Sequence, residues 1–340
     1  MPEDTCYEAH RLPFFVTGDC LCCVFALRDE QAMSLFPEIE PRASQYLAVG
    51  DGHELYVEEC GHPAGVPVVV LHGGPGAGAG PHMRRYFDPD RWRIIVFDQR
   101  GTGRSRARDR LAANTAAHLV ADMEVIRRHF NIDRWLLWGG SWGATLALLY
   151  AQAHPEHSLG LVLRGAFLGR QRDLDWLLRD GASRVFPEAW SDFVGPLPES
   201  ERHEPVAAYH RRLVETPDED VDTWARRWNA WEAACSTLIP GEPGGPGHLA
   251  MARIECHYFH NRNFMTENVL LDHMDRIRHL PAILVHGRYD MVCPLEQGRA
   301  LHECWPGSDL RVVEQAGHSA REPGIEAALV NAARDMEARL

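Results

Sequence analysis

One serine of the chain, Ser141, lies in a glycine-rich stretch, GGSWG at residues 139–143. Apolar residues 134–138 precede it and apolar residues 144–154 follow it, which predicts a buried strand and then a buried helix. In so tight a strand-to-helix turn the serine backbone is strained and its hydroxyl is exposed above the sheet, as a nucleophile requires. An ordinary Ser-Gly turn has the same letters, so the chemistry depends on partners elsewhere in the chain.

A serine nucleophile needs a general base, and the base needs an acid that fixes its tautomer. Two predicted strand ends supply them: Asp290 ends "AILVHGRYD", and His318 lies in "AGHS" just after "LRVVEQ". Alone each is weak evidence, because the chain has 19 histidines and aspartate is common in turns. Together, in the order Ser, Asp, His, they predict a catalytic triad of Ser141, Asp290 and His318. Asp98 is a rival acid, but it precedes the serine, and we expect it to support its own loop.

Acyl transfer by such a triad also needs donors for the oxyanion. We expect one to be the backbone N–H of Trp142 and the other to come from the loop HGGPG, residues 72–76. Within this loop we expect Gly74 rather than Gly73. The glycines could instead form a flexible turn. A dinucleotide site is disfavoured, because "GGPGAGAG" does not keep the G-x-G-x-x-G spacing and lacks an acidic partner strand.

Strands that alternate with helices must position these groups. The strand patterns are near-continuous apolar runs, which predicts an α/β fold with a mainly parallel sheet and helices on both faces. Functional groups are then expected at the carboxyl ends of the strands. The expected strands are two within 45–60, joined at Asp51-Gly52, and further ones at 66–71, 92–97, 134–138, 159–167, 281–290 and 309–315, with helices at 116–130 and at the C-terminus.

The alternating pattern breaks between about residues 170 and 275. This segment is rich in charge and tryptophan, reads as several helices and contains the loop "PGEPGGPG" at 240–247. We therefore expect a helical cap domain at 170–275, inserted into a catalytic domain formed by 33–169 and 276–340. Residues 1–32 share no periodic pattern with the rest, and we expect a disordered N-terminal extension or a misassigned start.

Composition excludes several classes of partner. The chain has 340 residues, of which 45% are hydrophobic, and a formal net charge of −13, which argues against nucleic acid. The apolar run Leu21 to Leu27 is too short to span a membrane, and Glu3 and Asp4 do not fit a signal peptide, so we expect a cytoplasmic protein. The nine cysteines are scattered without zinc-site spacing, which predicts reduced thiols and no metal.

A series of motifs is shared with a known family. In chain order they are "HGGPG", "FDQRGTGRS", "GGSWGATLAL", "YAQAHPEH", "LRGAF", "WNAWE", "ARIECHYF" and "VHGRYDMVCP", followed by "GHS". From about residue 35 to about residue 320 the chain closely resembles bacterial proline iminopeptidases, also called prolyl aminopeptidases. The resemblance implies an α/β-hydrolase fold with a helical cap. It also implies a serine exopeptidase without metal or cofactor, which releases N-terminal proline from small peptides through a prolyl-enzyme ester.

The resemblance also implies a role for two glutamates, Glu232 in "WNAWE" and Glu255 in "ARIECHYF", in binding the free amine of the substrate. From the residues alone both would be solvated helix surface. An N-terminal proline carries a secondary ammonium, which two carboxylates in a partly desolvated pocket would neutralise, fixing the scissile carbonyl over Ser141. At helical spacing beside Glu232 lie three tryptophans that we expect in the core of the cap: Trp224, Trp228 and Trp231.

The chain also departs from the family pattern. Thr102 stands where the family often has a small residue, the cap near "PGEPGGPG" is shortened, and residues 1–32 have no counterpart. Two alternatives to the peptidase stay open. One is an esterase or amidase of the same fold, for which the glutamates would be incidental. The other is a binding protein without catalysis, against which the intact triad argues.

Overall fold

The computed structural model describes residues 35–217, 219–239 and 248–340, all of them within the unit Met33–Leu340. The expectations for residues 1–32 and for the loop 240–247 therefore fall outside the described residues. Among the described residues, no helix is both long enough and apolar enough to cross a membrane.

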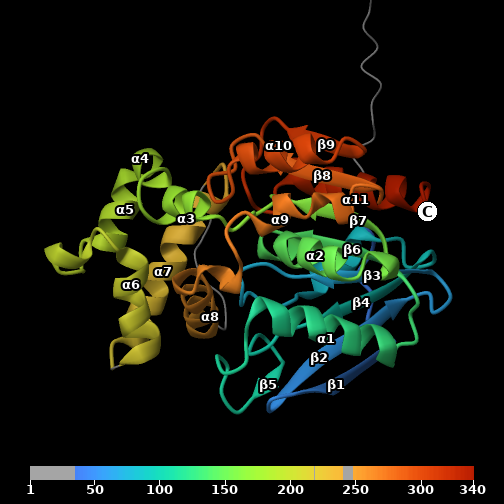
Figure 1. The fold of residues 1–340 in the computed structure, drawn as a ribbon, viewed down its shortest axis with the longest axis horizontal. Helices are drawn as coiled ribbons and strands as arrows, with labels where there is room; N and C mark the ends of the chain where they lie inside the picture. The colour runs from blue at the N-terminus through green and yellow to red at the C-terminus, as the bar shows by residue number, and fades with distance from the viewer. Residues whose placement is uncertain (1–34, 218, 240–247) are drawn as a thin grey trace, which may run out of the picture. The chain divides into compact units, whose positions relative to one another are not determined.

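Nine strands form one sheet in the order β1-β2-β4-β3-β6-β7-β8-β9, and the short strand β5 pairs with β2 (Figure 1). Strands β3, β4, β6, β7, β8 and β9 pair in parallel, whereas β1 and β2 are antiparallel. The predicted mainly parallel sheet is confirmed. The strands are β1 (Ala43–Gly50), β2 (His53–Gly61), β3 (Val66–Leu71), β4 (Trp92–Phe97), β5 (Arg106–Ala107), β6 (Trp135–Gly140), β7 (Ser158–Arg164), β8 (Ala282–Gly287) and β9 (Ser308–Val313).

Both faces of the sheet are buried. Successive side chains of a strand point to opposite faces, so each strand contributes to the packing on both. In β3, Val69 and Leu71 belong to one hydrophobic cluster, and Val68 and Val70 belong to another. Helices α1 and α2 contribute to the first cluster and α11 to the second; α1 and α2 lie in front of the strands in Figure 1. The helices outside 170–275 are η1 (Pro81–Tyr86), α1 (Ala116–His129), α2 (Trp142–Ala153), η2 (Pro155–His157), α10 (Leu295–Cys304) and α11 (Pro323–Glu337).

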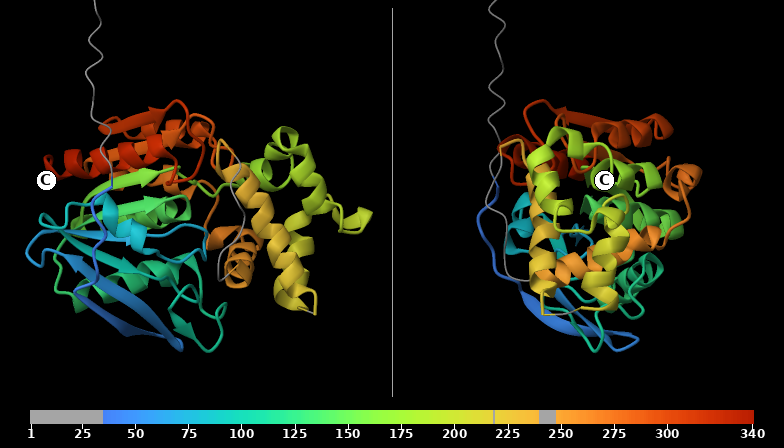
Figure 2. Two further views of the ribbon diagram at one scale, coloured as in Figure 1. Left: turned by 180° about the vertical axis from the view of Figure 1, so that it is seen from behind. Right: turned by 90° about the vertical axis from the view of Figure 1, so that its left-hand side faces the viewer.

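The described residues between β7 and β8 form helices and loops, and we call residues 170–275 the helical insertion. Helices α3 to α8 of this insertion form one group in Figure 1, and the right-hand view of Figure 2 looks onto it. The helices and turns are α3 (Gln171–Leu178), α4 (Ala182–Val185), α5 (Pro187–Val194), η3 (Glu199–Glu201), α6 (Pro205–His210), η4 (Arg211–Glu215), α7 (Val221–Ser236), α8 (His248–His260), η5 (Arg262–Phe264), α9 (Val269–Asp272) and η6 (Met274–Arg276).

Aromatic side chains form the interior of the helical insertion. The ring of Phe193 stacks on Tyr209, with centroids 4.5 Å apart, and also packs against Trp228 and Trp231. Trp228 and Trp231 are buried, while Trp224 is partly buried and packs on the same cluster. The three tryptophans therefore contribute to a core, as their helical spacing predicts.

Hydrogen bonds join the helical insertion to loops at the carboxyl ends of the strands. Trp176 Nε1 donates to the carbonyl of Met291, just beyond β8, at 2.9 Å. The backbone N–H of His318, beyond β9, donates to the carbonyl of Ser236 at the end of α7, at 3.0 Å. The insertion is thus held at the edge of the sheet where the predicted site residues lie.

Candidate active site

Ser141 lies between β6 and α2, with φ 59° and ψ −126°. A positive φ is uncommon for a residue with a side chain and is characteristic of strained functional positions. The turn is also extremely tight. A Cβ on Gly139 would collide with the carbonyl oxygen of Gly143, and a Cβ on Gly143 would collide with that of Leu71. The GGSWG stretch therefore forms the strained strand-to-helix turn that its sequence predicts.

Asp290 and His318 meet beyond the ends of β8 and β9. His318 Nδ1 lies 2.7 Å from Asp290 Oδ2, and both side chains are buried. The other carboxylate oxygen accepts the N–H groups of Val292 at 3.1 Å and Cys293 at 2.7 Å. Burial raises the pKa of Asp290, but the attraction of His318 and these hydrogen bonds outweigh it and hold the pKa below its ordinary value. The predicted acid is thus ionised and paired with the predicted base.

Arg164, the last residue of β7, is a member of the site that no sequence pattern singled out. Its Nη1 lies 3.0 Å from His318 Nε2 and donates to the His318 carbonyl at 2.9 Å. Because guanidinium only donates, Nε2 must be the acceptor, and the imidazole proton lies on Nδ1 facing Asp290. That is the tautomer of a general base. The sequence signal that could have identified Arg164 is a charged residue at the end of an otherwise apolar strand.

The hydrogen bonds of the described residues include none between Ser141 Oγ and His318. Such catalytic bonds often form only when the substrate is bound. In this structure the Nε2 atom that would take the serine proton instead accepts a hydrogen bond from Arg164. If His318 acts as the predicted base, Arg164 has to release this nitrogen before Nε2 can accept the serine proton.

The loop 72–76 lies beside Ser141 because β3 and β6 are neighbours, with Leu71 opposite Gly139. A Cβ on Gly73 would be 3.3 Å from the Cβ of Ser141 and 3.9 Å from its Oγ. Gln99 links this loop to α2. It donates from Nε2 to the His72 carbonyl at 2.9 Å and accepts from Trp142 Nε1 at 3.0 Å. The loop and the start of α2 are therefore adjacent to the serine, and the donor roles of Gly74 and Trp142 stay predictions.

Asp98 supports its own loop, as expected, instead of joining the site. Its Oδ1 accepts the N–H of Ala79 at 2.7 Å, and its Oδ2 accepts the backbone N–H and the Nε of Arg104 at 2.9 and 2.8 Å. The bond to Ala79 joins the loop after β4 to the loop after β3, and the two bonds to Arg104 hold the loop after β4 itself. Asp98 is thus excluded as the acid partner of His318.

Glu232 on α7 and Glu255 on α8 interact with each other inside the helical insertion. Glu255 is buried and accepts a hydrogen bond from Trp228 Nε1 at 2.6 Å. Glu232 is half-buried, but its Oε2 atom is shielded from solvent and has no hydrogen-bond partner. Their reading as solvated helix surface, which the residues alone favoured, is wrong. Helices α7 and α8 pack against each other, and the two carboxylates lie where these helices meet.

Burial is the main cause of the raised pKa values of this glutamate pair. It raises the pKa of Glu255 well above its ordinary value, and the charge of Glu232 raises it further. Burial also raises the pKa of Glu232, and the interactions with Glu255 and with the charge of His318 only partly offset this effect. His318 is the one positive side chain among these causes, and its effect is smaller than that of burial. The pair therefore holds a shared proton more strongly than free carboxylates do, and a cation placed between them would displace it.

A carboxylate that sequence reasoning missed, Glu322, connects the insertion to the histidine loop. Its Oε1 accepts the N–H of Leu238 at 2.7 Å, and its Oε2 accepts the N–H of Gly317 at 2.5 Å. Leu238 follows α7, which carries Glu232, and Gly317 directly precedes His318. Glu322 therefore fixes the helix of the glutamate pair relative to the catalytic base.

Among the described residues, one group of His, Cys, Asp and Glu side chains is close enough to hold a metal: His210, Glu215 and His260. It contains no predicted site residue.

Comparison with known proteins agrees with this geometry. The family model described as "alpha/beta hydrolase fold" matches residues 66–322. A "Probable proline iminopeptidase" of Leptolyngbya boryana is 49% identical over 88% of this chain and 95% of its own length. The proline iminopeptidases of Xylella fastidiosa and Arabidopsis thaliana are each 47% identical, over 87% and 90% of this chain and 97% and 82% of their own lengths. This chain belongs to the proline iminopeptidase family.

Solved structures with much lower identity share the fold of this family member. A putative lipase from Acinetobacter baumannii superposes with a TM-score of 0.58 at 15% identity, covering 88% of this chain and 93% of the lipase. An esterase from Rhodococcus gives a TM-score of 0.55 at 18% identity, covering 87% of this chain and 99% of the esterase. The α/β-hydrolase fold expected from the motifs is confirmed.

Proposed function

We propose that this protein is a proline iminopeptidase, a serine exopeptidase that releases N-terminal proline from small peptides. The observation that carries the proposal is the pairing of half-buried Glu232 with buried Glu255, since helix α7, which carries Glu232, is hydrogen-bonded to the His318 loop. The relatives named above support it, because they are proline iminopeptidases at 47–49% identity. An acyl hydrolase that accepts neutral esters has no need of two carboxylates held at an electrostatic cost.

In the proposed reaction, the hydroxyl of Ser141 attacks the proline carbonyl while His318 Nε2 accepts its proton and Asp290 stabilises the imidazolium. The oxyanion accepts hydrogen bonds from the N–H groups of Trp142 and Gly74. His318 then protonates the leaving amine, and a prolyl ester of Ser141 remains. Water attacks this ester with the same base, and free proline leaves.

The cation of the substrate explains the glutamate pair. The secondary ammonium of an N-terminal proline has two N–H donors, one for each carboxylate, and replaces the shared proton of the pair. Because the amine is only one carbon away from the scissile carbonyl, fixing the ammonium also fixes the carbonyl relative to Ser141. The pair thus selects a free N-terminus and excludes longer N-terminal extensions.

We further propose that residues 33–169 and 276–340 form the catalytic domain and that residues 170–275 act as a cap domain over it. The insertion supplies both glutamates, while the two flanking segments supply the triad. The hydrogen bonds of Ser236 and Trp176 support this division, since they hold the insertion against the loops of Asp290 and His318.

We also propose a cytoplasmic location. Small peptides are the proposed substrates, and neither nucleic acid nor a membrane is a proposed partner. The five cysteines of the described residues are free, four of them buried, which suits a reducing compartment. The formal charge of −13 would repel a phosphate backbone. Fractionation of cells of the source organism, followed by activity assays, tests the location.

The deciding experiment compares three substrates of the purified protein: a proline arylamide, its N-acetylated form and a short acyl ester. We expect the highest kcat/KM for the free amine and a loss of at least about 100-fold on N-acetylation, because acylation removes the charge. A matched alanine arylamide controls for the pyrrolidine ring. Faster hydrolysis of the acyl ester than of the proline arylamide would favour the esterase alternative instead.

A further inference from the structure

A cluster of imidazoles and one carboxylate lies in the helical insertion, outside the proposed active site. His210 ends α6, Glu215 ends η4 and His260 ends α8. The rings of His210 and His260 stack, with centroids 3.9 Å apart and planes at 8°. His210 Nδ1 lies 3.1 Å from Glu215 Oε1. One potential ligand atom from each of the three residues lies within 4.8 Å of the other two.

An irregular helical turn brings the carboxylate to the histidine. In an α-helix, residues five apart point about 140° away from each other, so His210 and Glu215 would lie on different faces. Here η4 is a π-helical turn, closed by the hydrogen bond from Thr216 N–H to the Arg211 carbonyl at 2.8 Å. Its wider winding returns Glu215 to His210. Turns of this kind are rare and are frequently found at functional sites.

Few other groups compete with a metal ion for His210. Its Nδ1 faces Glu215, which is itself a member of the cluster. His210 is buried, and its Nε2 has no hydrogen-bond partner. Neutral imidazole is the form that binds metal ions.

We propose that His210, Glu215 and His260 bind a divalent transition-metal ion, with zinc as the expected occupant. Two imidazoles and one carboxylate form a donor set that zinc prefers, and solvent completes the coordination. Bonds of about 2.0–2.2 Å place tetrahedral ligand atoms roughly 3.4 Å apart. The separation of His210 and Glu215 already fits. His260 and Glu215 are exposed, so the His260 ring can rotate out of its stack on His210 and bring a nitrogen, now within 4.8 Å of the other ligand atoms, to this spacing.

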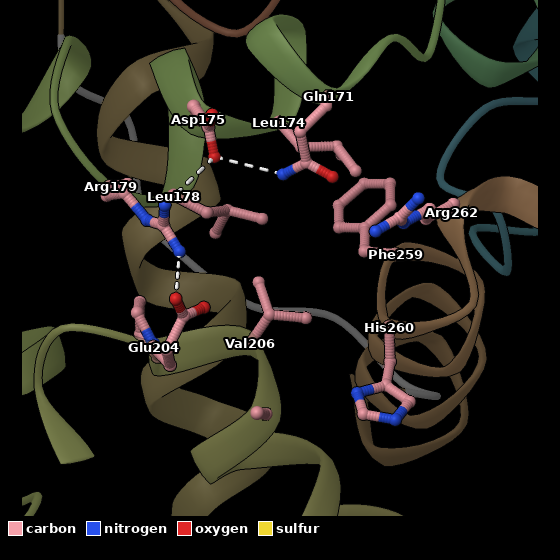
Figure 3. Close-up of a pocket in the computed structure, with 12 residues that line it drawn as sticks. Gln171, Leu174, Asp175, Leu178, Arg179, Glu204, Val206, Phe259, His260 and Arg262 are labelled. Atoms are coloured by element: carbon pink, nitrogen blue, oxygen red, sulfur yellow. Dashed lines mark hydrogen bonds and ion pairs between the residues drawn. The ribbon is translucent and has the colours of Figure 1, made fainter. Parts of the chain in front are cut away.

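A cavity of about 220 Å³ beside the cluster gives solvent access to it. The cavity lies between α3, α6 and α8, and Figure 3 shows His260 at its edge near Val206. Across the cavity, Arg179 forms ion pairs with Asp175 and Glu204. Two carboxylates thus neutralise the guanidinium that faces the cluster across the cavity.

The proposed metal site would connect two parts of the helical insertion, one of which also carries Glu255. His210 and Glu215 lie on one side of it, and His260 belongs to α8, which also carries Glu255. A metal bound there would therefore cross-link α6 and η4 to α8. A ligand that binds only the folded state raises its stability, so the metal is expected to stabilise the insertion. The site stands apart from the proposed peptidase activity.

Isothermal titration of the full-length, untagged and chelator-treated protein with zinc chloride tests the proposal. We expect the wild type to bind one equivalent of zinc at this site. In His260→Ala and in Glu215→Gln the zinc affinity of the site should fall by about 10–100-fold or more, so that this equivalent is lost. Zinc should also raise the Tm of the wild type and not that of either variant. His203→Ala is the matched control, because His203 is an exposed histidine of the same insertion without a role in the cluster.

Cobalt supplies a readout that does not depend on the folding of any variant. Bound to the wild type at this site, it should give ligand-field absorption without the thiolate charge-transfer band that cysteine ligands produce. This distinction matters because the chain has nine cysteines. Zinc binding of equal stoichiometry and affinity in wild type, His260→Ala and Glu215→Gln, or cobalt spectra with thiolate bands alone, would overturn the proposal.

Discussion

Asp290 of the triad and Glu255 of the glutamate pair are both buried, yet their surroundings treat charge in opposite ways. Asp290 accepts hydrogen bonds from two backbone N–H groups and faces His318, so its pKa lies below the ordinary value. Glu255 has Trp228 and a second carboxylate as neighbours, and its pKa lies well above the ordinary value. The proposed catalytic half of the site is thus electrostatically complete. In the proposed recognition half, no Lys or Arg of the described residues is among the groups that affect the two glutamates.

This difference indicates what each half is built for. A catalytic acid and base must keep one arrangement through the reaction, so their charges are satisfied by the protein itself. A recognition site gains affinity by leaving a charge unsatisfied until the substrate supplies its counterpart. Substitutions should therefore affect the two halves differently. Damage to the triad should affect every substrate, whereas damage to the pair should affect only substrates with a free amine.

The largest effect is expected for Ser141→Ala. Without the nucleophile only binding and the oxyanion donors remain, so we expect kcat to fall by about 10⁴-fold or more on the proline arylamide and on the acyl ester alike. Steady-state assays of both substrates, with circular dichroism to verify folding, check this. Ser191→Ala, on α5 of the insertion, is the control. Near-normal turnover in a folded Ser141→Ala protein would remove Ser141 from its role.

The next largest effect is expected for Glu232→Gln and Glu255→Gln. Each change keeps the shape of the side chain but removes a charge that faces the ammonium, so kcat/KM for the proline arylamide should fall by roughly 2–4 kcal/mol. The acyl ester should be hydrolysed at nearly the wild-type rate. The double variant should lose less than the sum, because both carboxylates act on one cation.

Glu188→Gln, an exposed glutamate of the same insertion, controls for a general effect of charge removal. Equal losses of Glu232→Gln or Glu255→Gln on amine and ester substrates would contradict the comparison. They would show that the pair supports the triad or the insertion instead of binding the amine.

The same contrast explains which parts of the site could be predicted from sequence. Ser141, Asp290 and His318 each follow an apolar strand, and parallel pairing then brings all three to one edge of the sheet. That inference needs only chain order and periodicity. Glu232 and Glu255 are on helices whose packing decides their burial, and single charged residues in a helix pattern normally indicate surface. Only the family resemblance placed them in the site.

The contacts of Arg164 and Glu322 show a further limit of sequence patterns. Arg164 bonds to His318, which lies far along the chain, and Glu322 joins Leu238 to Gly317. These contacts depend on how the insertion and the last loop meet, which no local periodicity encodes. The fold itself was predictable in its strands and their parallel pairing, because near-continuous apolar runs indicate strands that are buried on both faces, as the two hydrophobic clusters are.

A smaller effect is expected when the pair keeps both carboxylates but loses a neighbour. Trp228→Phe removes the 2.6 Å hydrogen bond to Glu255 and so the group that fixes its orientation. Because a hydrogen bond to a charged group contributes about 1.5–3 kcal/mol, kcat/KM for the proline arylamide should fall by at least about tenfold, mainly through KM. The acyl ester should be unaffected.

Trp231→Phe is the matched control for Trp228→Phe. It is a buried tryptophan of the same helix, and its Nε1 donates to the Leu177 carbonyl at 3.0 Å instead of to a glutamate. If Trp231→Phe raised KM for the arylamide as much as Trp228→Phe, the effect would come from lost packing. The proposed orientation of Glu255 by Trp228 would then be wrong.

The smallest effect is on stability, and its sign distinguishes the two halves most directly. A carboxyl whose pKa is raised on folding stabilises the protein fully below its unfolded pKa, and this contribution is lost as pH rises through the folded pKa. Glu255, with its raised pKa, should thus cost stability at neutral pH. We expect Glu255→Gln to raise the Tm there by about a few degrees and to have little effect in acid.

Asp290→Asn should do the reverse in the same melting experiment. Its pKa is lowered on folding, so its stabilisation is present above the unfolded pKa and is lost as pH falls through the folded value. The Tm of Asp290→Asn should therefore lie below that of the wild type at neutral pH and approach it in acid. A fall in Tm for both variants at neutral pH would mean that the free protein already neutralises Glu255. The substrate ammonium would then have no charge left to satisfy.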